Sequence, residues 1–204
     1  MEYLDNLNKL EFNELDNEMM EYAKINNVPI IQTEGLHFLR QVIMLKGCKR
    51  ILEIGTAIGY SSIQMAKLGA IIDTIEINSD SYNIALYNIK KANLCDKINV
   101  YLADALEIDI NLLGKYDLIF IDAAKAQYIN FFNKFKVLLN DNGVILTDNL
   151  LFHGLVLEKD TIESRNLRQL VKKIDNYNYW LMEQNDFDTT IYNIGDGIAL
   201  SIKK

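Results

Sequence analysis

The chain has 204 residues, half of them hydrophobic, and its 28 acidic side chains outnumber 21 basic ones, which gives a formal net charge of −7. A chain of this length is expected to form one domain that buries about 70% of its unfolded surface, and its acidity excludes a strongly basic nucleic-acid-binding surface overall, although a local basic face is compatible with it. Two cysteines without metal-ligand spacing favour a reduced, cytoplasmic protein, and we expect neither a signal peptide nor a membrane-spanning segment.

The beginning of the chain predicts two amphipathic helices. Apolar residues recur at mostly helical spacing over residues 3–26 and again over residues 34–46, and Pro29 separates the two segments. We expect these N-terminal helices, within residues 1–47, to pack against the remainder of a single domain that covers residues 1–204.

From residue 50 onward, predicted strands and helices alternate. Apolar runs predict strands over residues 50–55, 71–76, 97–102, 116–122 and 143–148. Helical patterns predict helices over residues 59–69, 79–94, 126–139 and 161–176, and a short helical turn near 104–108. Continuous apolar runs such as Leu118–Ile121 are typical of strands that are buried on both faces. The alternation therefore predicts a doubly wound α/β domain with a parallel sheet over residues 50–204.

The C-terminal part of the chain departs from this alternation. Residues 179–184, 187–193 and 197–203 are β-like with no helix between them, and Gly195-Asp196-Gly197 is typical of a hairpin turn. We therefore expect an antiparallel edge to complete a mostly parallel sheet.

A glycine-containing turn follows the first predicted strand. Residues 51–61, Ile-Leu-Glu-Ile-Gly-Thr-Ala-Ile-Gly-Tyr-Ser, run from a strand through this turn into a helix, and Glu76 ends the next strand 21 residues after Gly55. Such a unit binds nucleosides, with the acid on the ribose hydroxyls. A dinucleotide-binding turn has three glycines in the pattern G-x-G-x-x-G, whereas this turn has only two, four residues apart. Such a turn suits a ligand that ends in an amino acid, such as S-adenosylmethionine, better than a dinucleotide. An ordinary glycine turn is the alternative.

Ligands of such sheets bind at the carboxyl ends of the strands, where the strand order reverses. The residues to inspect at those ends are Glu53 to Ser61, Glu76, Asp104, Asp122 and Asp148. Any single carboxylate there is more often a helix cap. Several carboxylates at one edge of the sheet predict a binding site.

Three of these residues predict a metal site if the strands that carry them are neighbours. Asp122 ends one strand, and Asp148 and Asn149 end the next. Two carboxylates and an amide oxygen suit Mg²⁺, although a helix cap and the start of a loop explain the same residues. Lys125 follows Asp122 by three residues and can serve as a general base, with an ordinary solvated lysine as the alternative.

Other residues are candidates for contacts with cofactor or substrate. Ser61 begins a helix. Its hydroxyl, together with the free N–H groups of the first turn, can hold the carboxylate of a methionine moiety, or the hydroxyl can simply cap the helix. Asp104 and Ala105 are placed to meet an adenine edge. Ile31 can pack on the cofactor or belong to the core, and His153, in the loop after Asn149, can touch the substrate.

Four motifs resemble the Mg²⁺-dependent O-methyltransferases of the catechol and caffeoyl-CoA type. They are Glu53-Ile-Gly-Thr-Ala-Ile-Gly-Tyr-Ser61, Ile121-Asp-Ala-Ala-Lys125, Thr147-Asp-Asn149 and Ile194-Gly-Asp-Gly197, and the resemblance covers nearly the whole chain. Residues 32–39 and 148–156 resemble the bacterial branch, which includes the tRNA methyltransferase that converts wobble 5-hydroxyuridine to 5-methoxyuridine.

The resemblance implies a Rossmann-like sheet of seven strands and a role for each matching residue. S-adenosylmethionine would be bound by Ile31, Glu53, Gly55, Thr56, Ser61, Glu76, Asp104, Ala105 and Asp122. Mg²⁺ would be bound by Asp122, Asp148 and Asn149, and Lys125 would be the base. Ala124 stands where the plant branch has an acid, which argues against a phenylpropanoid substrate. His153 replaces a lysine common in the tRNA branch, and Asn193 replaces a proline.

Three functions remain open at this point. A tRNA 5-hydroxyuridine O-methyltransferase comes first, because the 5-hydroxyl beside the 4-carbonyl offers a metal two adjacent oxygens. A methyltransferase of catechol-like molecules satisfies the same geometry, and a non-catalytic binding module is the third possibility. A tRNA substrate needs a local basic patch, for which Arg165 and Arg168 are the preferred candidates. The resemblance also suggests a homodimer, and the strand-sized apolar stretches lead us to expect no membrane partner.

Overall fold

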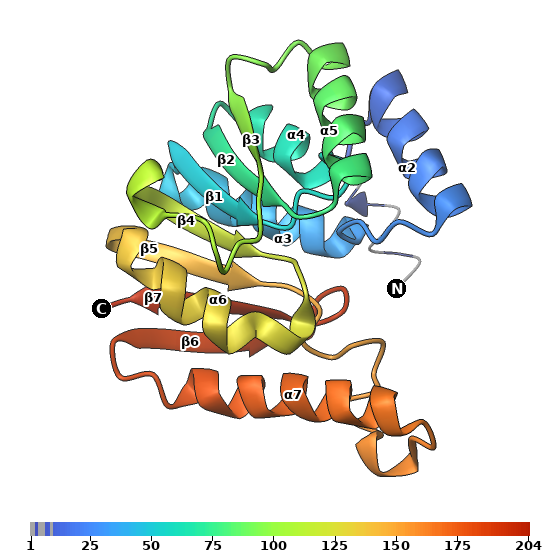
Figure 1. Cartoon of the computed structure of the whole chain (residues 1–204), viewed down its shortest axis with the longest axis vertical. Coiled ribbons are helices and arrows are strands. Elements are labelled where there is room, and N and C mark those ends of the chain that lie inside the picture. Colours follow the sequence, from blue (N-terminus) through green and yellow to red (C-terminus); the bar gives the residue numbers. More distant parts are fainter. Residues whose placement is uncertain (1–2, 4–6, 9) are drawn as a thin grey trace.

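The computed structural model describes residues 3, 7, 8 and 10–204 and contains one seven-stranded sheet. The strands are β1 (Arg50–Ile54), β2 (Ile71–Glu76), β3 (Ile98–Leu102), β4 (Tyr116–Ile121), β5 (Leu139–Thr147), β6 (Phe187–Tyr192) and β7 (Ile198–Lys203). Their order is β3-β2-β1-β4-β5-β7-β6 (Figure 1). β1 to β5 pair in parallel, whereas β7 is antiparallel to both of its neighbours. The predicted fold class is confirmed, including the antiparallel edge.

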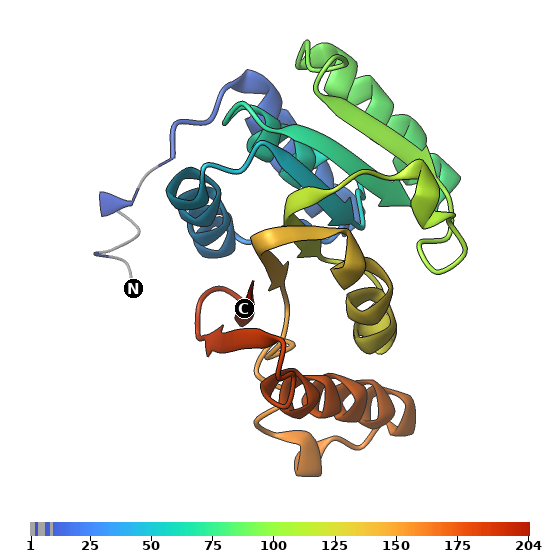
Figure 2. The same cartoon turned by 90° about the vertical axis from the view of Figure 1, so that its left-hand side faces the viewer.

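Helices cover both faces of this sheet. They are α2 (Glu14–Asn26), α3 (Thr33–Lys46), α4 (Tyr60–Ala66), α5 (Ser79–Lys91), α6 (Tyr128–Phe135) and α7 (Arg165–Met182). Short 3-10 helices are η1 (Ile110–Leu112), η2 (Lys125–Gln127), η3 (Lys136–Leu138) and η4 (Lys159–Thr161). α3 lies on one side of the sheet and α6 and α7 on the other (Figure 2).

Successive residues of the central strands pack into hydrophobic cores on opposite faces of the sheet, and this explains their continuous apolar runs. Ile51 and Phe120 pack with α2 to α5, whereas Leu52 and Ile119 pack with α6 and α7. All four side chains are fully buried. Burial on both faces makes most positions within these strands apolar, as the sequence predicts, and Glu53 of β1 is a buried exception.

Several predicted elements differ from the structure. Residues 179–184 are not a strand, because α7 continues to Met182. Its buried residues Val171, Ile174, Tyr177 and Leu181 recur at helical spacing, so packing against the sheet overrides the β-like composition of this segment. The helix predicted over 126–139 is divided among η2, α6 and η3, and β5 begins at Leu139 instead of residue 143.

The N-terminal helix is shorter than predicted. α2 begins after Asn13, whose side chain accepts a hydrogen bond from Asp16 N while the Asp16 side chain bonds back to Asn13 N. This capping box sets the start of the helix. The part of the predicted helix at residues 4–6 and 9 lies outside the described residues. Within the described part of the chain, no helix combines the length and apolarity needed to cross a bilayer.

A buried carboxylate attaches α2 to the rest of the domain. Asp16 is 1% exposed, and it accepts hydrogen bonds from Gln64 Nε2 at 2.7 Å and from Lys67 Nζ at 2.6 Å. Gln64 belongs to α4 and Lys67 directly follows it. Asp16 thereby fixes α2 and, through it, the following segment that precedes α3.

We expect Asp16→Ala to lower the free energy of unfolding by about 2–4 kcal/mol, because it leaves a partly buried ammonium and a buried amide without their acceptor. Urea unfolding at pH 7 measures this loss. Glu18→Ala is the matched control, since Glu18 lies on the same helix and pairs with Lys91 at the surface, and it should leave the urea midpoint nearly unchanged. Equal midpoints for the two variants would contradict the anchoring role.

Candidate active site

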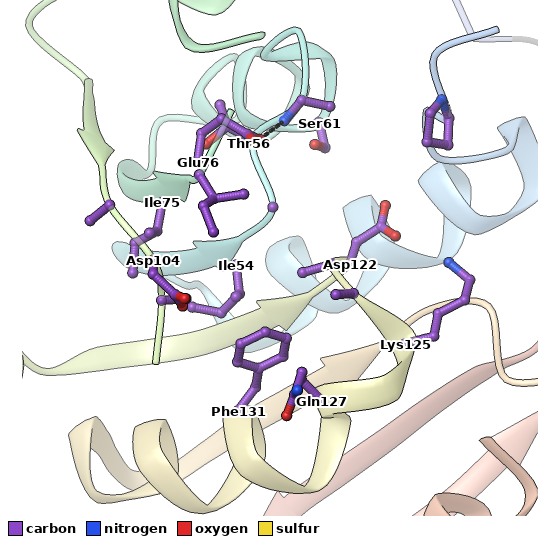
Figure 3. Close-up of a pocket in the computed structure, with 18 of the residues that line it drawn as sticks. Ile54, Thr56, Ser61, Ile75, Glu76, Asp104, Asp122, Lys125, Gln127 and Phe131 are labelled. Carbon is purple, nitrogen blue, oxygen red and sulfur yellow. Dashed lines mark hydrogen bonds between the residues drawn. The ribbon is translucent and has the colours of Figure 1, made fainter. Parts of the chain in front are cut away.

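A cavity of about 330 Å³ lies at the carboxyl ends of β1, β2 and β4. β1 lies between β2 and β4, so this is the place where the strand order reverses. Figure 3 shows side chains from several segments that converge on it. The predicted residues that line it are Ile31, Gly55, Thr56, Ser61, Glu76, Asp104, Ala105, Asp122 and Lys125. Residues from five separate segments of the sequence are therefore brought together.

The turn after β1 depends on close packing against the end of β4. Gly55 has φ 101°, and a Cβ atom there would lie 2.1 Å from the Asp122 carbonyl oxygen. Only glycine fits this position, and its absence of a side chain brings the turn onto Asp122. Ala57 has φ 47° without being glycine. Its N–H donates to Glu76 Oε2 at 2.8 Å, which helps to hold this unfavourable conformation.

Glu76 ends β2 at the wall of the cavity. Its Oε2 bonds to the glycine turn through Ala57, and its Oε1 accepts a hydrogen bond from Asn78 N at 2.8 Å. Each carboxylate oxygen keeps a further lone pair. Glu76 is therefore fixed in orientation and can still accept hydrogen bonds from a pair of ligand hydroxyls.

Glu53 lies behind the cavity wall. Its side chain is fully buried and is not part of the lining. Its carboxylate accepts hydrogen bonds from Ser61, Ser62 and Thr74, the last at 2.6 Å. Burial raises the pKa of Glu53 to about 7, although these three hydroxyls oppose the shift. In this structure Glu53 orients Ser61 and the first turn of α4, which do reach the cavity.

The three predicted metal ligands lie at the tips of adjacent strands. β4 and β5 pair with Ile121 opposite Thr147, so Asp122 and Asp148 follow at equivalent positions. Asp148 is 2% exposed, and Asp122 is half-buried at the cavity wall. Burial raises the pKa of both carboxyls, and repulsion by Asp122 adds to the increase at Asp148. A cation between them would relieve both effects.

Lys125 joins the cavity to the third predicted ligand. Its side chain lines the cavity, and its Nζ donates to Asn149 Oδ1 at 2.7 Å. Tyr128 OH donates to the Asp148 carbonyl at 2.9 Å and supports the end of β5. Within the described ranges, no group of three or more His, Cys, Asp or Glu side chains has the arrangement of a metal site. Any metal here would therefore use the mixed set of two carboxylates and one amide.

The predicted substrate residues lie in and after the loop that follows β5, outside the cavity lining. His153 is exposed, and Arg165 begins α7 in an exposed position. The Arg168 guanidinium instead donates to the Ile162 carbonyl, with Nε at 2.9 Å, and so stabilises the loop before α7. Three acidic side chains, Glu158, Asp160 and Glu163, precede these arginines in the chain, so this edge has no uniform positive charge.

Several residues of the cavity wall were not predicted. They are Pro29, Ile30, Ile75, Ile77, Ala103, Leu106, Ala123, Ala124, Gln127 and Phe131, whereas Ile54, Ala57 and Tyr60 fall within the predicted segment from Glu53 to Ser61. Most are apolar, and apolar residues give no sequence signal that separates a cavity wall from a core. Gln127 and Phe131 follow Lys125 closely in the chain. The position of that lysine just before a predicted helix was the only sequence signal that could have placed them at the cavity.

Comparisons with known proteins agree on one protein family. A family model described as O-methyltransferase matches residues 5–204. A caffeoyl-CoA O-methyltransferase from Populus kitakamiensis is 30% identical over 189 residues, which cover 88% of this chain and 80% of that protein. A candidate caffeoyl-CoA O-methyltransferase from Staphylococcus aureus has a solved structure that is 40% identical, with a TM-score of 0.94 over 100% of this chain and 98% of that one. A Bacillus cereus O-methyltransferase in complex with SAH is 25% identical, with a TM-score of 0.84 over 100% and 96% of the two chains.

We expect Glu53→Gln to change how stability depends on pH. The folded-state pKa of Glu53 is about 7 against an ordinary 4.5, so the stability that its protonated form contributes is present below pH 4.5 and is lost as the pH rises through 7. Glutamine stays neutral throughout. Between pH 5 and 8, the unfolding free energy of the unmodified protein should fall by about 1–3 kcal/mol relative to that of the variant. Urea unfolding at each pH measures both, and parallel pH profiles would contradict the assignment.

Proposed function

The chain belongs to the O-methyltransferase family, and from that premise we propose that it transfers the methyl group of S-adenosylmethionine to the 5-hydroxyl of 5-hydroxyuridine at the wobble position of tRNA. The observation that carries the proposal is the arrangement at the tips of β4 and β5. There Asp122, Asp148, Asn149 and Lys125 adjoin a cavity bounded by a nucleoside-binding turn.

The cavity supports a role in binding S-adenosylmethionine. Glu76 would accept hydrogen bonds from the ribose hydroxyls, and Asp104 and Ala105 lie where the adenine would sit. Ser61 and the N–H groups at the start of α4 would hold the methionine carboxylate. Ile31 offers an apolar contact, and Glu53 would act through Ser61. The related Bacillus cereus enzyme contains SAH, the product of this cofactor.

The oxygen ligands at the strand tips fit a hard divalent cation. Asp122, Asp148 and Asn149 would hold Mg²⁺, because two mutually repelling buried carboxylates and an amide oxygen are the donors it prefers. When bound, Mg²⁺ supplies electrostatic stabilisation of the negative charge that develops on the acceptor oxygen. The cation would also compete with Lys125 for Asn149 Oδ1, which frees the lysine for chemistry.

Lys125 is the proposed general base. In its neutral form, Nζ accepts the proton of the acceptor hydroxyl while the oxygen attacks the methyl carbon. The new O–C bond forms as the C–S bond breaks, and the sulfonium becomes the neutral thioether of SAH. General-base assistance contributes about 10²–10⁴-fold, and holding the reactants in line contributes about 7–11 kcal/mol.

The tRNA substrate rests on the chemistry of the acceptor and on Ala124. The 5-hydroxyl and 4-carbonyl of 5-hydroxyuridine form an adjacent oxygen pair, and Ala124 lines the cavity where plant relatives carry an acid. Arg165, Lys172 and Lys173 are exposed on α7 and offer contacts to phosphates.

A catechol-like small molecule is the second candidate. It presents the same pair of adjacent oxygens, and relatives named as caffeoyl-CoA and flavonoid methyltransferases favour it. The mixed charges before α7 also suit a small substrate better than an anticodon loop.

We further propose that the protein forms a homodimer. Ile25 and Tyr22 of α2 provide exposed apolar surface for such a contact.

Metal binding should depend on pH. In the presence of SAH, MgCl₂ should raise the thermal midpoint more at pH 8 than at pH 6, because protons compete for carboxyls whose pKa is raised. Differential scanning fluorimetry measures both shifts. Asp148→Asn should abolish most of the Mg²⁺-dependent shift and keep the shift caused by SAH alone. Undiminished methyl transfer in excess chelator would exclude the proposed cation.

The substrate is identified by one assay with labelled S-adenosylmethionine. Undermodified tRNA that carries 5-hydroxyuridine is compared with a panel of catechols, and we expect label in the tRNA. Label in catechols alone would establish the second candidate. Lys125→Ala should lower kcat by about 10²–10⁴-fold on the accepted substrate. Lys125→Arg is the matched control, because arginine keeps the cation but cannot be deprotonated. Full activity in Lys125→Arg would contradict the role as base.

A further inference from the structure

The turn between β6 and β7 packs against the loop that follows β5. Leu150 N donates to the Gly197 carbonyl at 2.9 Å, and Leu151 N donates to the Asp196 carbonyl at 2.8 Å. A Cβ atom on Gly197 would lie 2.6 Å from the Leu151 side chain. The two segments are thus in direct contact, although 43 residues separate His153 from Asp196.

This loop has an unfavourable backbone. Asn149, Phe152 and His153 all have positive φ, at 62°, 47° and 56°, and none of them is glycine. Such conformations cost free energy and persist only where neighbouring structure imposes them. The contacts from the β6–β7 turn therefore hold the loop in a shape that its own residues disfavour.

Asp196 is the polar centre of these contacts. It is 5% exposed, and its Oδ1 accepts a hydrogen bond from His153 N. Its Oδ2 is buried and has no hydrogen-bond partner among the residues that the structure describes. His153 Nδ1 lies 3.8 Å from that Oδ2, which is too far for a hydrogen bond. A buried carboxylate with one free oxygen is costly unless it has a specific use.

The loop places the Phe152 ring next to the proposed base and the His153 ring beside Phe152. The rings of Phe152 and His153 lie 5.6 Å apart, and Lys125 Nζ lies 5.9 Å from the centroid of the Phe152 ring. Phe152 also packs on a small apolar cluster beneath α7, which includes Val171 and Ile174. One ring is therefore supported by the core, and the other remains exposed to solvent.

We propose that Asp196 is a positioning residue that holds the Phe152–His153 ring pair beside Lys125, where the pair forms one wall for a planar acceptor ring. This inference rests on the proposed function and names the surface that would receive the acceptor ring. The acceptor must be a flat ring with adjacent oxygens, and it stacks on these side chains while its oxygens meet the strand tips. Nucleobases and catechols both satisfy this chemistry.

The test measures acceptor affinity separately from cofactor affinity. Calorimetry in the presence of SAH and MgCl₂ uses the nucleoside 5-hydroxyuridine and 3,4-dihydroxybenzoate as probes. For the probe that the unmodified protein binds, Phe152→Leu and Asp196→Ala should each raise the Kd about tenfold, and the Kd for SAH should stay within twofold. Asp196→Asn should have a smaller effect, because its amide oxygen can still accept from His153 N.

Asp188→Asn is the matched control, since Asp188 is an exposed acid of the same hairpin, and it should change neither affinity. If Asp196→Ala does not fold, Asp196→Asn and Phe152→Leu decide the question. Unchanged acceptor affinity in these variants would overturn the inference, as would an equal loss of SAH affinity or the failure of both probes to bind. Binding without methyl transfer would instead remove the proposed function and leave the ring pair intact.

Discussion

The site depends on one electrostatic constraint, the placement of a buried and a half-buried carboxylate at the tips of adjacent parallel strands. Asp122 and Asp148 repel each other where little water can screen them, and such burial costs free energy unless a cation offsets it. The backbone of Asp122 also contacts Gly55, so one residue shapes both the nucleoside-binding turn and the place where charge is concentrated. The proposed cofactor site and the proposed catalytic site therefore share Asp122, and the position of one constrains the position of the other.

Three further buried carboxylates fix the walls around this centre. Asp16 attaches α2 and the segment that precedes α3, Glu53 orients the start of α4, and Asp196 holds the loop after β5. Asp16 accepts hydrogen bonds from Gln64 and Lys67, Glu53 accepts them from three hydroxyl groups, and Asp196 accepts one from a backbone N–H. A site built in this way loses little entropy when a ligand binds, because its polar groups are already oriented.

The sequence predicts most of the fold because the central strands face a core on both sides, which makes them continuous apolar runs. It also predicts the residues at the strand ends, since parallel topology brings those ends together. Residues 179–184 were misassigned because local composition favours a strand, whereas Tyr177 and Leu181 pack as a helix. The positions of Glu53 behind the wall and of Arg168 against a carbonyl depend on tertiary contacts that no local pattern encodes. Asp196 belongs to the Gly195-Asp196-Gly197 motif that the sequence singles out. Its contacts with the loop after β5 could not be predicted, because they depend on the tertiary packing of two distant segments.

The exchange of partners at Asn149 links structure to chemistry most directly. Its Oδ1 now accepts from Lys125, and the account requires a cation to take that place and release the lysine. Crystals grown with MnCl₂ and SAH test this by anomalous diffraction. The account predicts a manganese peak bonded to Asp122, Asp148 and Asn149, with Lys125 Nζ withdrawn from the amide oxygen. An ordered SAH molecule with no peak between the strand tips, and with the bond from Lys125 to Asn149 retained, would contradict it.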